Sequence, residues 1–146
     1  MEISDNGINL IKTFEGLELE AYQCSGNVWT IGWGSTELYG VRVKRGDVIT
    51  PREAEELLRF DIKKFEYLVN TRINTTITQN QFDALVSHAY NTGGSDTLFE
   101  LINANEKEKK IRHWFENTYI TSRGIFLRGL KNRRILEANL FFSVDV

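Results

Sequence analysis

The chain contains a single cysteine and a single proline among its 146 residues. One cysteine cannot form a disulfide within the chain, so packing alone must hold the fold together. Because Pro51 is the only proline, we expect many helices with few interruptions.

Long apolar runs are absent as well. No stretch approaches the roughly 20 consecutive apolar residues that a membrane-spanning helix needs. The first residues, MEISDNG, are polar and acidic, unlike a secretory signal peptide. We therefore expect a chain that is synthesised in the cytoplasm without a signal peptide and that contains no integral membrane segment.

Basic residues are not in excess either. The chain has 18 Lys and Arg against 20 Asp and Glu, a net charge of −2. General nucleic-acid binders normally carry a strong basic excess, so we expect no nucleic-acid partner. With 41% hydrophobic and 26% charged residues, the composition predicts a globular core, and the length suits one domain or two small lobes sharing a helix.

Helical patterns cover most of the chain. The strongest follows Thr50, Pro51 and Glu53, which supply an N-cap, a proline at the first helical position and a capping-box acid. Thr78 and Gln81 form a second capping box. We expect helices over residues 4–15, 51–70, 78–92, 96–103, 106–116 and 128–142.

Residues 17–43 have a different pattern. Glycines separate short runs rich in Tyr, Trp, Val, Thr and Ile, which is typical of a small hairpin or a three-stranded sheet with tight turns. The tetrapeptide CSGN is the expected first turn. Together, the two patterns predict a mostly helical α+β fold with a small antiparallel sheet near the N-terminus.

Three side chains in this part of the sequence are candidates for chemistry. Glu15 has apolar neighbours at the end of the first helix, and partial desolvation there would suit a general acid; a solvated helix-end glutamate is the alternative. Cys24 has polar, turn-forming neighbours, which favours an accessible thiol over a buried one. Thr30 would hold a water through its hydroxyl, or would be an ordinary strand residue.

Other residues allow different interpretations. Cys24 could pair with His88 or His113 in nucleophilic catalysis, although His88 equally suits a satisfied histidine at a helix border. One cysteine and two scattered histidines have no metal-ligand spacing, so we expect no metal and no other cofactor. A solvated helix face is predicted for the basic residues of the last helix: Arg128, Lys131, Arg133 and Arg134.

The spacing of Glu15, Cys24 and Thr30 resembles the Glu–Asp/Cys–Thr triad of the phage-type lysozymes, glycoside hydrolase family 24. The surrounding motifs strengthen the resemblance: FEG before the sheet, AY before the turn, and WTIGWGST after it. Further along, ITPREAEELLRFDI, QNQFDALVSHAYNTGG and FLRGLKNRRILEANLF are similar to the family's connecting helix, central helix and closing segment. The resemblance covers nearly the whole chain and is strongest to lambdoid-prophage endolysins.

The resemblance implies a single lysozyme-like domain over residues 1–146, with an active-site cleft between two lobes. A small β-containing lobe would cover about 13–50, a connecting helix about 51–70, and a helical lobe about 71–146 plus the N-terminal helix. The implied reaction is hydrolysis of the β-1,4 bond between N-acetylmuramic acid and N-acetylglucosamine in peptidoglycan. The partners would be peptidoglycan glycan strands, and we expect a monomer that acts on the cell wall in the periplasm or outside after release.

The resemblance also assigns roles to the triad. Glu15 would protonate the leaving oxygen, while Cys24 and Thr30 would face it from the hairpin. Cys24 would act as a thiolate that stabilises the cationic sugar or attacks it, or as a thiol that helps Thr30 to place water. Inversion by an activated water is implied. The chain departs from the family in having Cys24 where aspartate is commoner, Ser35 where histidine is frequent, and a loosely matching region over residues 105–125.

Two further interpretations differ in function rather than fold. One is a catalytically silent peptidoglycan-binding domain on a lysozyme fold. The other is the same muramidase chemistry used as a secreted antibacterial effector instead of for phage release.

Overall fold

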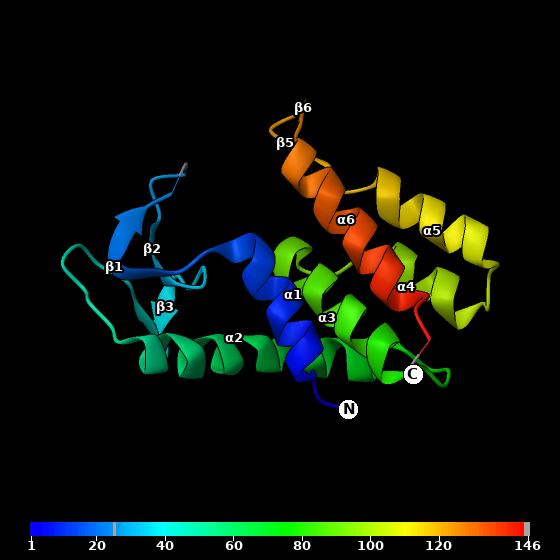
Figure 1. Ribbon diagram of the computed structural model, residues 1–146, viewed down its shortest axis with the longest axis horizontal. Coiled ribbons are helices and arrows are strands. Elements are labelled where there is room, and N and C mark those ends of the chain that lie inside the picture. Colours follow the sequence, from blue (N-terminus) through cyan, green and yellow to red (C-terminus); the bar gives the residue numbers. More distant parts are fainter. Residues whose placement is uncertain (25, 145–146) are drawn as a thin grey trace. The chain divides into compact units, whose positions relative to one another are not determined.

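The computed structural model describes residues 1–24 and 26–144, and in this part of the chain six helices and three short strand pairs follow one another (Figure 1). The elements are α1 (Asp5–Glu15), β1 (Glu18–Gln23), β2 (Trp29–Gly32), β3 (Glu37–Leu38), β4 (Val41–Arg42), α2 (Pro51–Arg72), α3 (Gln79–Thr92), α4 (Asp96–Asn103), α5 (Glu108–Asn117), β5 (Thr121–Ser122), β6 (Ile125–Phe126) and α6 (Arg128–Phe141). The prediction of a mostly helical α+β fold is confirmed.

The helix boundaries follow the capping signals in the sequence. Before α2, the Thr50 hydroxyl accepts from the Glu53 N–H and the Glu53 carboxylate accepts from the Thr50 N–H, both at 3.1 Å. Thr78 and Gln81 form the same reciprocal box before α3, and Gly93 ends that helix in the left-handed conformation with φ 88°. Each box satisfies N–H groups that the first turn of a helix otherwise leaves unpaired.

The chain forms two compact units. We call residues 11–64 the hairpin unit and residues 1–10 with 65–146 the helical unit. The boundaries between the units fall inside two helices. α1 begins in the helical unit and ends in the hairpin unit, and α2 begins in the hairpin unit and ends in the helical unit.

The strands of the hairpin unit form two pairs. β1 pairs antiparallel with β2, and β3 pairs antiparallel with β4, with isolated bridges between Glu20 and Val48 and between Ile31 and Ser35. Of the two predicted alternatives, the hairpin is therefore right and the three-stranded sheet is wrong. Strand and helix residues share one buried cluster: Ile31, Val43, Ile49, Ala54 and Leu57.

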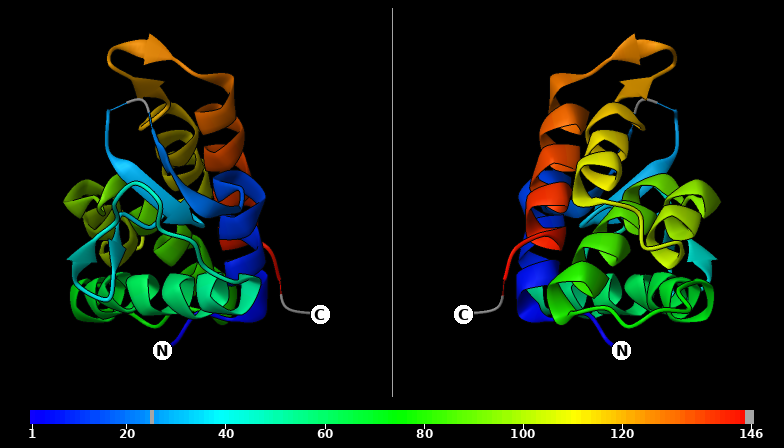
Figure 2. Two further views of the ribbon diagram at one scale, coloured as in Figure 1. Left: turned by 90° about the vertical axis from the view of Figure 1, so that its left-hand side faces the viewer. Right: turned by 90° about the vertical axis from the view of Figure 1, so that its right-hand side faces the viewer.

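In the helical unit, α3 packs against α6, and α6 packs against α5 (Figure 2). α3 is the most buried of these three helices, since eight consecutive residues from Phe82 to Ala89 are buried. The β5–β6 hairpin lies between α5 and α6 in the sequence and was not predicted. It falls in the region that resembles the phage-type lysozymes only loosely.

The basic residues of α6 correct one prediction. Arg133 and Arg134 are 2% and 0% exposed, so they do not belong to a solvated helix face. Both reach Glu137, at 3.2 Å from Arg133 Nε and 2.7 Å from Arg134 Nε, and Ser87 of α3 donates to the same carboxylate at 2.7 Å. We call these four residues the buried ion cluster.

None of the helices in the described part of the chain is both long enough and apolar enough to cross a membrane.

Candidate functional site

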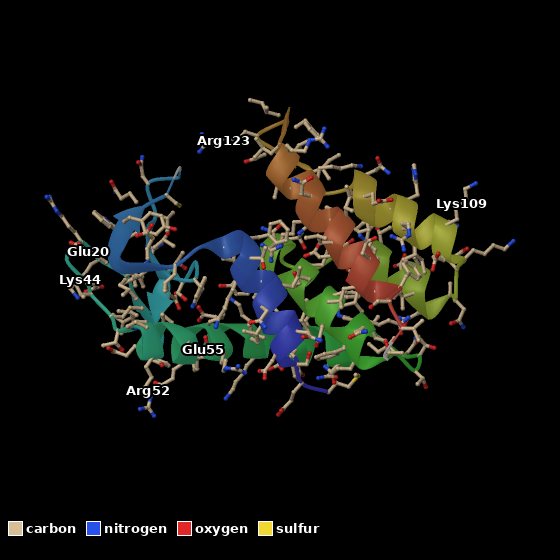
Figure 3. All side chains as sticks on the ribbon, in the orientation of Figure 1. Glu20, Lys44, Arg52, Glu55, Lys109 and Arg123 are labelled. Carbon is tan, nitrogen blue, oxygen red and sulfur yellow. The ribbon has the colours of Figure 1, made fainter. Side chains whose placement is uncertain are left out.

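Glu15 is the last residue of α1. It is half-buried, and Gly16 follows it with φ 65°, a left-handed conformation that ends helices. One turn earlier, Lys12 forms an ion pair with Glu55 of α2, and its ammonium lies 5.2 Å from the centre of the Trp33 ring. Glu55 is labelled on α2 in Figure 3. These contacts join the last turn of α1 to α2 and to the end of β2, and so limit where Glu15 can lie.

Cys24 lies in the loop that connects β1 to β2. Its N–H donates to the Val28 carbonyl at 3.0 Å, and its carbonyl accepts from the Asn27 N–H at 2.9 Å. The turn predicted for CSGN is therefore present, although Ser25 itself lies outside the described residues. Asn27 takes a positive φ of 59°, which asparagine tolerates better than most residues. The thiol is exposed, as the polar neighbours of Cys24 predicted.

The surroundings of Cys24 favour its thiolate. The N–H of Gly26 and the hydroxyl of Thr30 hydrogen-bond the sulfur and lower the pKa of the thiol below its usual range. A side-chain acceptor bonded to the N–H two residues ahead is the pattern that aspartate forms in an Asx turn. The sulfur of Cys24 thus takes the place that a carboxylate oxygen would have in the same turn.

Thr30 is buried on β2, with only 5% of its surface exposed. Its hydroxyl donates to the Val28 carbonyl at 3.1 Å and also lies within hydrogen-bond reach of the Cys24 sulfur. A hydroxyl has one hydrogen and two lone pairs. Beside a neutral thiol it can accept from sulfur while it donates to Val28, and beside a thiolate it can turn its hydrogen to sulfur. Thr30 is therefore suited to either protonation state of Cys24.

Tyr22 connects the three candidates; in the sequence it stands only as part of the AY motif before the turn. It pairs with Thr30 across the hairpin, and Cys24 follows two residues later, so strand alternation predicts that all three side chains share one face. Burial raises the pKa of Tyr22, and the negative charges of Cys24, Glu18 and Glu15 raise it further. Glu15 and Cys24 thus lie within electrostatic range of the same phenol.

Ser35 fixes the base of the hairpin to α2. It is 2% exposed, and its hydroxyl donates to Asp61 at 2.5 Å. Its backbone exchanges two hydrogen bonds of 2.8 Å with Ile31, directly beside Thr30. Burial raises the pKa of Asp61, and the bond from Ser35 opposes that rise. Ser35, which stands where the family frequently has histidine, therefore supports the hairpin through the hydrogen bond from its neutral hydroxyl to Asp61.

His88 is buried rather than placed at a helix border, which corrects that prediction. It is 1% exposed, and three aromatic rings surround it with centroids 5.5–5.6 Å away: Trp114, Phe115 and Tyr119. Burial lowers its pKa well below the usual range, and Arg134 and Arg133 lower it further. These surroundings favour a neutral ring, whereas a thiolate–imidazolium pair requires a charged one.

His113 is exposed on α5, beside Asn117. Among the described residues, no group of three or more His, Cys, Asp or Glu side chains is arranged to hold a metal ion.

The fold and the hairpin together define a protein of lysozyme type: a mostly helical chain in which a helix-end glutamate precedes a hairpin carrying a thiol and a hydroxyl. The family model for phage lysozyme matches residues 12–137. The chain belongs to the phage lysozyme family.

Individual relatives and solved structures agree with this family assignment. The chain is 42% identical to the endolysin of Bacillus phage PZA, over 98% of its own length and 56% of the relative's. It is 38% identical to the endolysin of Acyrthosiphon pisum secondary endosymbiont phage 1, over 98% and 99%. Among solved structures, the endolysin from Escherichia coli O157:H7 phage FAHEc1 superposes with a TM-score of 0.89, 38% identity and coverage of 98% and 94%.

The chain therefore spans little more than half of the Bacillus phage relative and nearly all of the endosymbiont phage relative.

Proposed function

We propose that this chain is a muramidase that hydrolyses the β-1,4 bond between N-acetylmuramic acid and N-acetylglucosamine in peptidoglycan, acting on the cell wall after release. The observation that carries the proposal is the hairpin itself: backbone hydrogen bonds to Val28 and Asn27 hold the exposed Cys24 in the turn, and Thr30 pairs with Tyr22, two residues before Cys24. The effect of the Glu15 charge on the pKa of Tyr22 agrees with this arrangement. Membership of the phage lysozyme family supports it. Peptidoglycan glycan strands are the corresponding partner.

Glu15 is the proposed general acid. A glycosidase needs a protonated carboxyl beside the scissile bond to deliver a proton to the leaving oxygen. Glu15 is half-buried at a helix end held by the Lys12 contacts, which gives the carboxyl a defined position. In the proposed reaction its proton passes to the glycosidic oxygen as the bond to the sugar carbon breaks.

Cys24 is proposed to supply the negative charge on the other side of the reacting sugar. As a thiolate it stabilises the oxocarbenium-like transition state and accepts a proton from the attacking water, which Thr30 helps to place. The donors from Gly26 and Thr30 support this role because both lower the pKa of the thiol. The resemblance implies inversion, which proton NMR of the first products would test directly.

The assignment of Glu15 is tested by Glu15→Gln. We expect release of new reducing ends from purified peptidoglycan to fall by at least about a hundredfold, because the amide cannot protonate the leaving oxygen. Unfolding in urea should be unchanged within error, since the substitution keeps the size of the side chain. Near wild-type turnover would overturn the assignment, and no reducing ends from the wild type would favour a silent binding domain.

The role of Cys24 is tested by three substitutions. Cys24→Asp should keep substantial activity because it restores a negative charge to a turn that already supplies the donors. Cys24→Ala should lose most activity, and so should wild type alkylated at this single thiol. Cys24→Ser separates charge from water placement: it keeps a hydroxyl without charge, so we expect it to behave like Cys24→Ala. Full activity of the serine variant would show that Cys24 works as a neutral group.

A further inference from the structure

Charge is divided unevenly along the chain. Residues 105–146 carry nine basic and five acidic side chains, whereas residues 1–104 carry nine and fifteen. The net charge of −2 therefore combines a C-terminal third of +4 with a remainder of −6. Because Arg133 and Arg134 are buried with Glu137, much of the accessible basic charge of this third lies on α5 and the β5–β6 hairpin.

The β5–β6 hairpin is the most exposed part of the helical unit. Every residue from 121 to 129 is exposed, including three consecutive apolar side chains: Ile125 at 66%, Phe126 at 48% and Leu127 at 43%. An arginine lies on each side of them, in the sequence RGIFLR. Arg123 projects outward at this hairpin, and Lys109 projects outward from the first turn of α5 (Figure 3).

Both arginines occupy positions that the local backbone disfavours. Arg123 and Gly124 have φ values of 52° and 76°, and a two-residue turn with both φ values positive is a type I′ turn, which prefers asparagine or glycine at its first position. Arg128 is the first residue of α6, where the helix dipole disfavours a cation. Its guanidinium lies 5.5 Å from the centre of the Phe126 ring, which holds it beside the apolar side chains.

Residues that oppose their local backbone preferences are most readily explained by a function outside folding. We propose that the β5–β6 hairpin is a docking surface for peptidoglycan whose stem peptides carry free carboxylates. Arg123 and Arg128 pair with these carboxylates, and Ile125 and Phe126 cover apolar faces of the sugars. The inference rests on the proposed function for its ligand, and it explains how a chain of net negative charge engages an anionic polymer.

Charge complementarity favours this ligand, yet an anionic phospholipid surface offers the same sign of charge. A membrane contact would draw most of its affinity from insertion of Ile125 and Phe126. A peptidoglycan contact would depend chiefly on the arginines and on the carboxylates of the polymer. The two partners are therefore separable by experiment.

The test measures binding in a Glu15→Gln background, so that the polymer is not digested. Cosedimentation with insoluble sacculi at low salt compares this parent with the same chain carrying Arg123→Asn and Arg128→Gln. We expect the affinity to fall roughly three- to tenfold, because the variant loses two solvent-exposed ion pairs with the polymer. The loss should shrink at high salt and disappear on sacculi whose carboxylates have been amidated, because both treatments remove the charge interaction.

A matched pair, Arg45→Gln and Lys63→Gln, removes two exposed cations from the hairpin unit and changes net charge equally. The affinity of this control variant for sacculi should stay within about twofold of the parent, because screened charges act only on nearby groups of the polymer. Arg123→Asn creates an Asn–Gly turn, so its free energy of unfolding should be unchanged or higher, which separates lost binding from lost folding.

Three results would overturn the proposal: no loss with the hairpin variant, an equal loss with the control pair, or a loss that persists on amidated sacculi. Comparable binding of the parent to phosphatidylglycerol vesicles, abolished by Phe126→Ser, would assign the hairpin to a membrane instead. The proposed function is tested separately, since the reducing-end assay uses the wild type and the docking assay uses an inactive chain.

Discussion

Substitution of Glu137 by glutamine tests the interpretation of the buried ion cluster. The carboxylate of Glu137 is fully buried and accepts from three groups: Arg134 Nη2 at 3.2 Å, Arg133 Nε at 3.2 Å and the Ser87 hydroxyl at 2.7 Å. Burial raises the pKa of Glu137, and the two guanidiniums, with Ser87, oppose that rise. Glu137→Gln removes the only negative charge from this cluster and turns an NH₂ group toward its donors.

The expected effect is large because the arginines have no route to water. Arg133 and Arg134 are 2% and 0% exposed, so both cations would stay buried beside a neutral amide. Removing one partner from a buried ion pair typically costs about 3–5 kcal/mol. For a chain of this size each kcal/mol lowers Tm by about 2–4 °C, so we expect Tm to fall by roughly 6–20 °C.

The measurement is urea and thermal unfolding at neutral pH, with Glu100→Gln as the control. Glu100 is an exposed glutamate on α4, and the same chemical change there should alter stability by less than about 0.5 kcal/mol. A loss below about 1 kcal/mol at Glu137 would refute the reasoning, because it would mean that the buried guanidiniums find other partners without cost.

Two further predictions concern titration. Burial holds the pKa of His88 well below that of an unfolded histidine, so the unfolded chain takes up a proton first as pH falls. The free energy of unfolding should therefore decrease below about pH 6.5, by up to about 1.4 kcal/mol per pH unit, and His88→Phe should flatten this dependence. At Cys24, the pKa is lowered by the Gly26 N–H and then by the Thr30 hydroxyl, so Thr30→Val should move the pH midpoint of iodoacetamide alkylation upward, and Thr30→Ser should not. An unmoved midpoint in the valine variant would contradict the hydrogen bond to sulfur.

Much of the fold could be predicted because its signals are local. The capping boxes at Thr50 and Thr78 fixed the start of α2 and α3, and the glycine at position 93 fixed the end of α3. The turn after β1 was predictable for the same reason, since glycine and asparagine within four residues specify a tight reversal. The spacing from Glu15 to Thr30 predicted the proposed site residues through family resemblance.

Features that depend on distant parts of the chain escaped prediction. Arg133 and Arg134 look solvated in a basic helix, and only packing against α3 shows that they are buried. The β5–β6 turn was missed because Arg123 occupies a position where asparagine would have marked a hairpin. The AY motif marked Tyr22 without giving it a role, since its importance comes from its partner across the hairpin.

The exchange of a carboxylate for sulfur at position 24 is explained by the turn rather than by the residue. The backbone holds the Gly26 N–H beside position 24, and the Thr30 hydroxyl, which donates to Val28, can turn its hydrogen to a negatively charged acceptor there. An aspartate would accept from both, and a thiolate does the same with one atom. The difference is that aspartate is charged at any neutral pH, whereas a thiol depends on these donors for its charge. Thr30 should therefore matter more to activity with cysteine at position 24 than with aspartate, and Thr30→Val should impair the wild type more than it impairs Cys24→Asp.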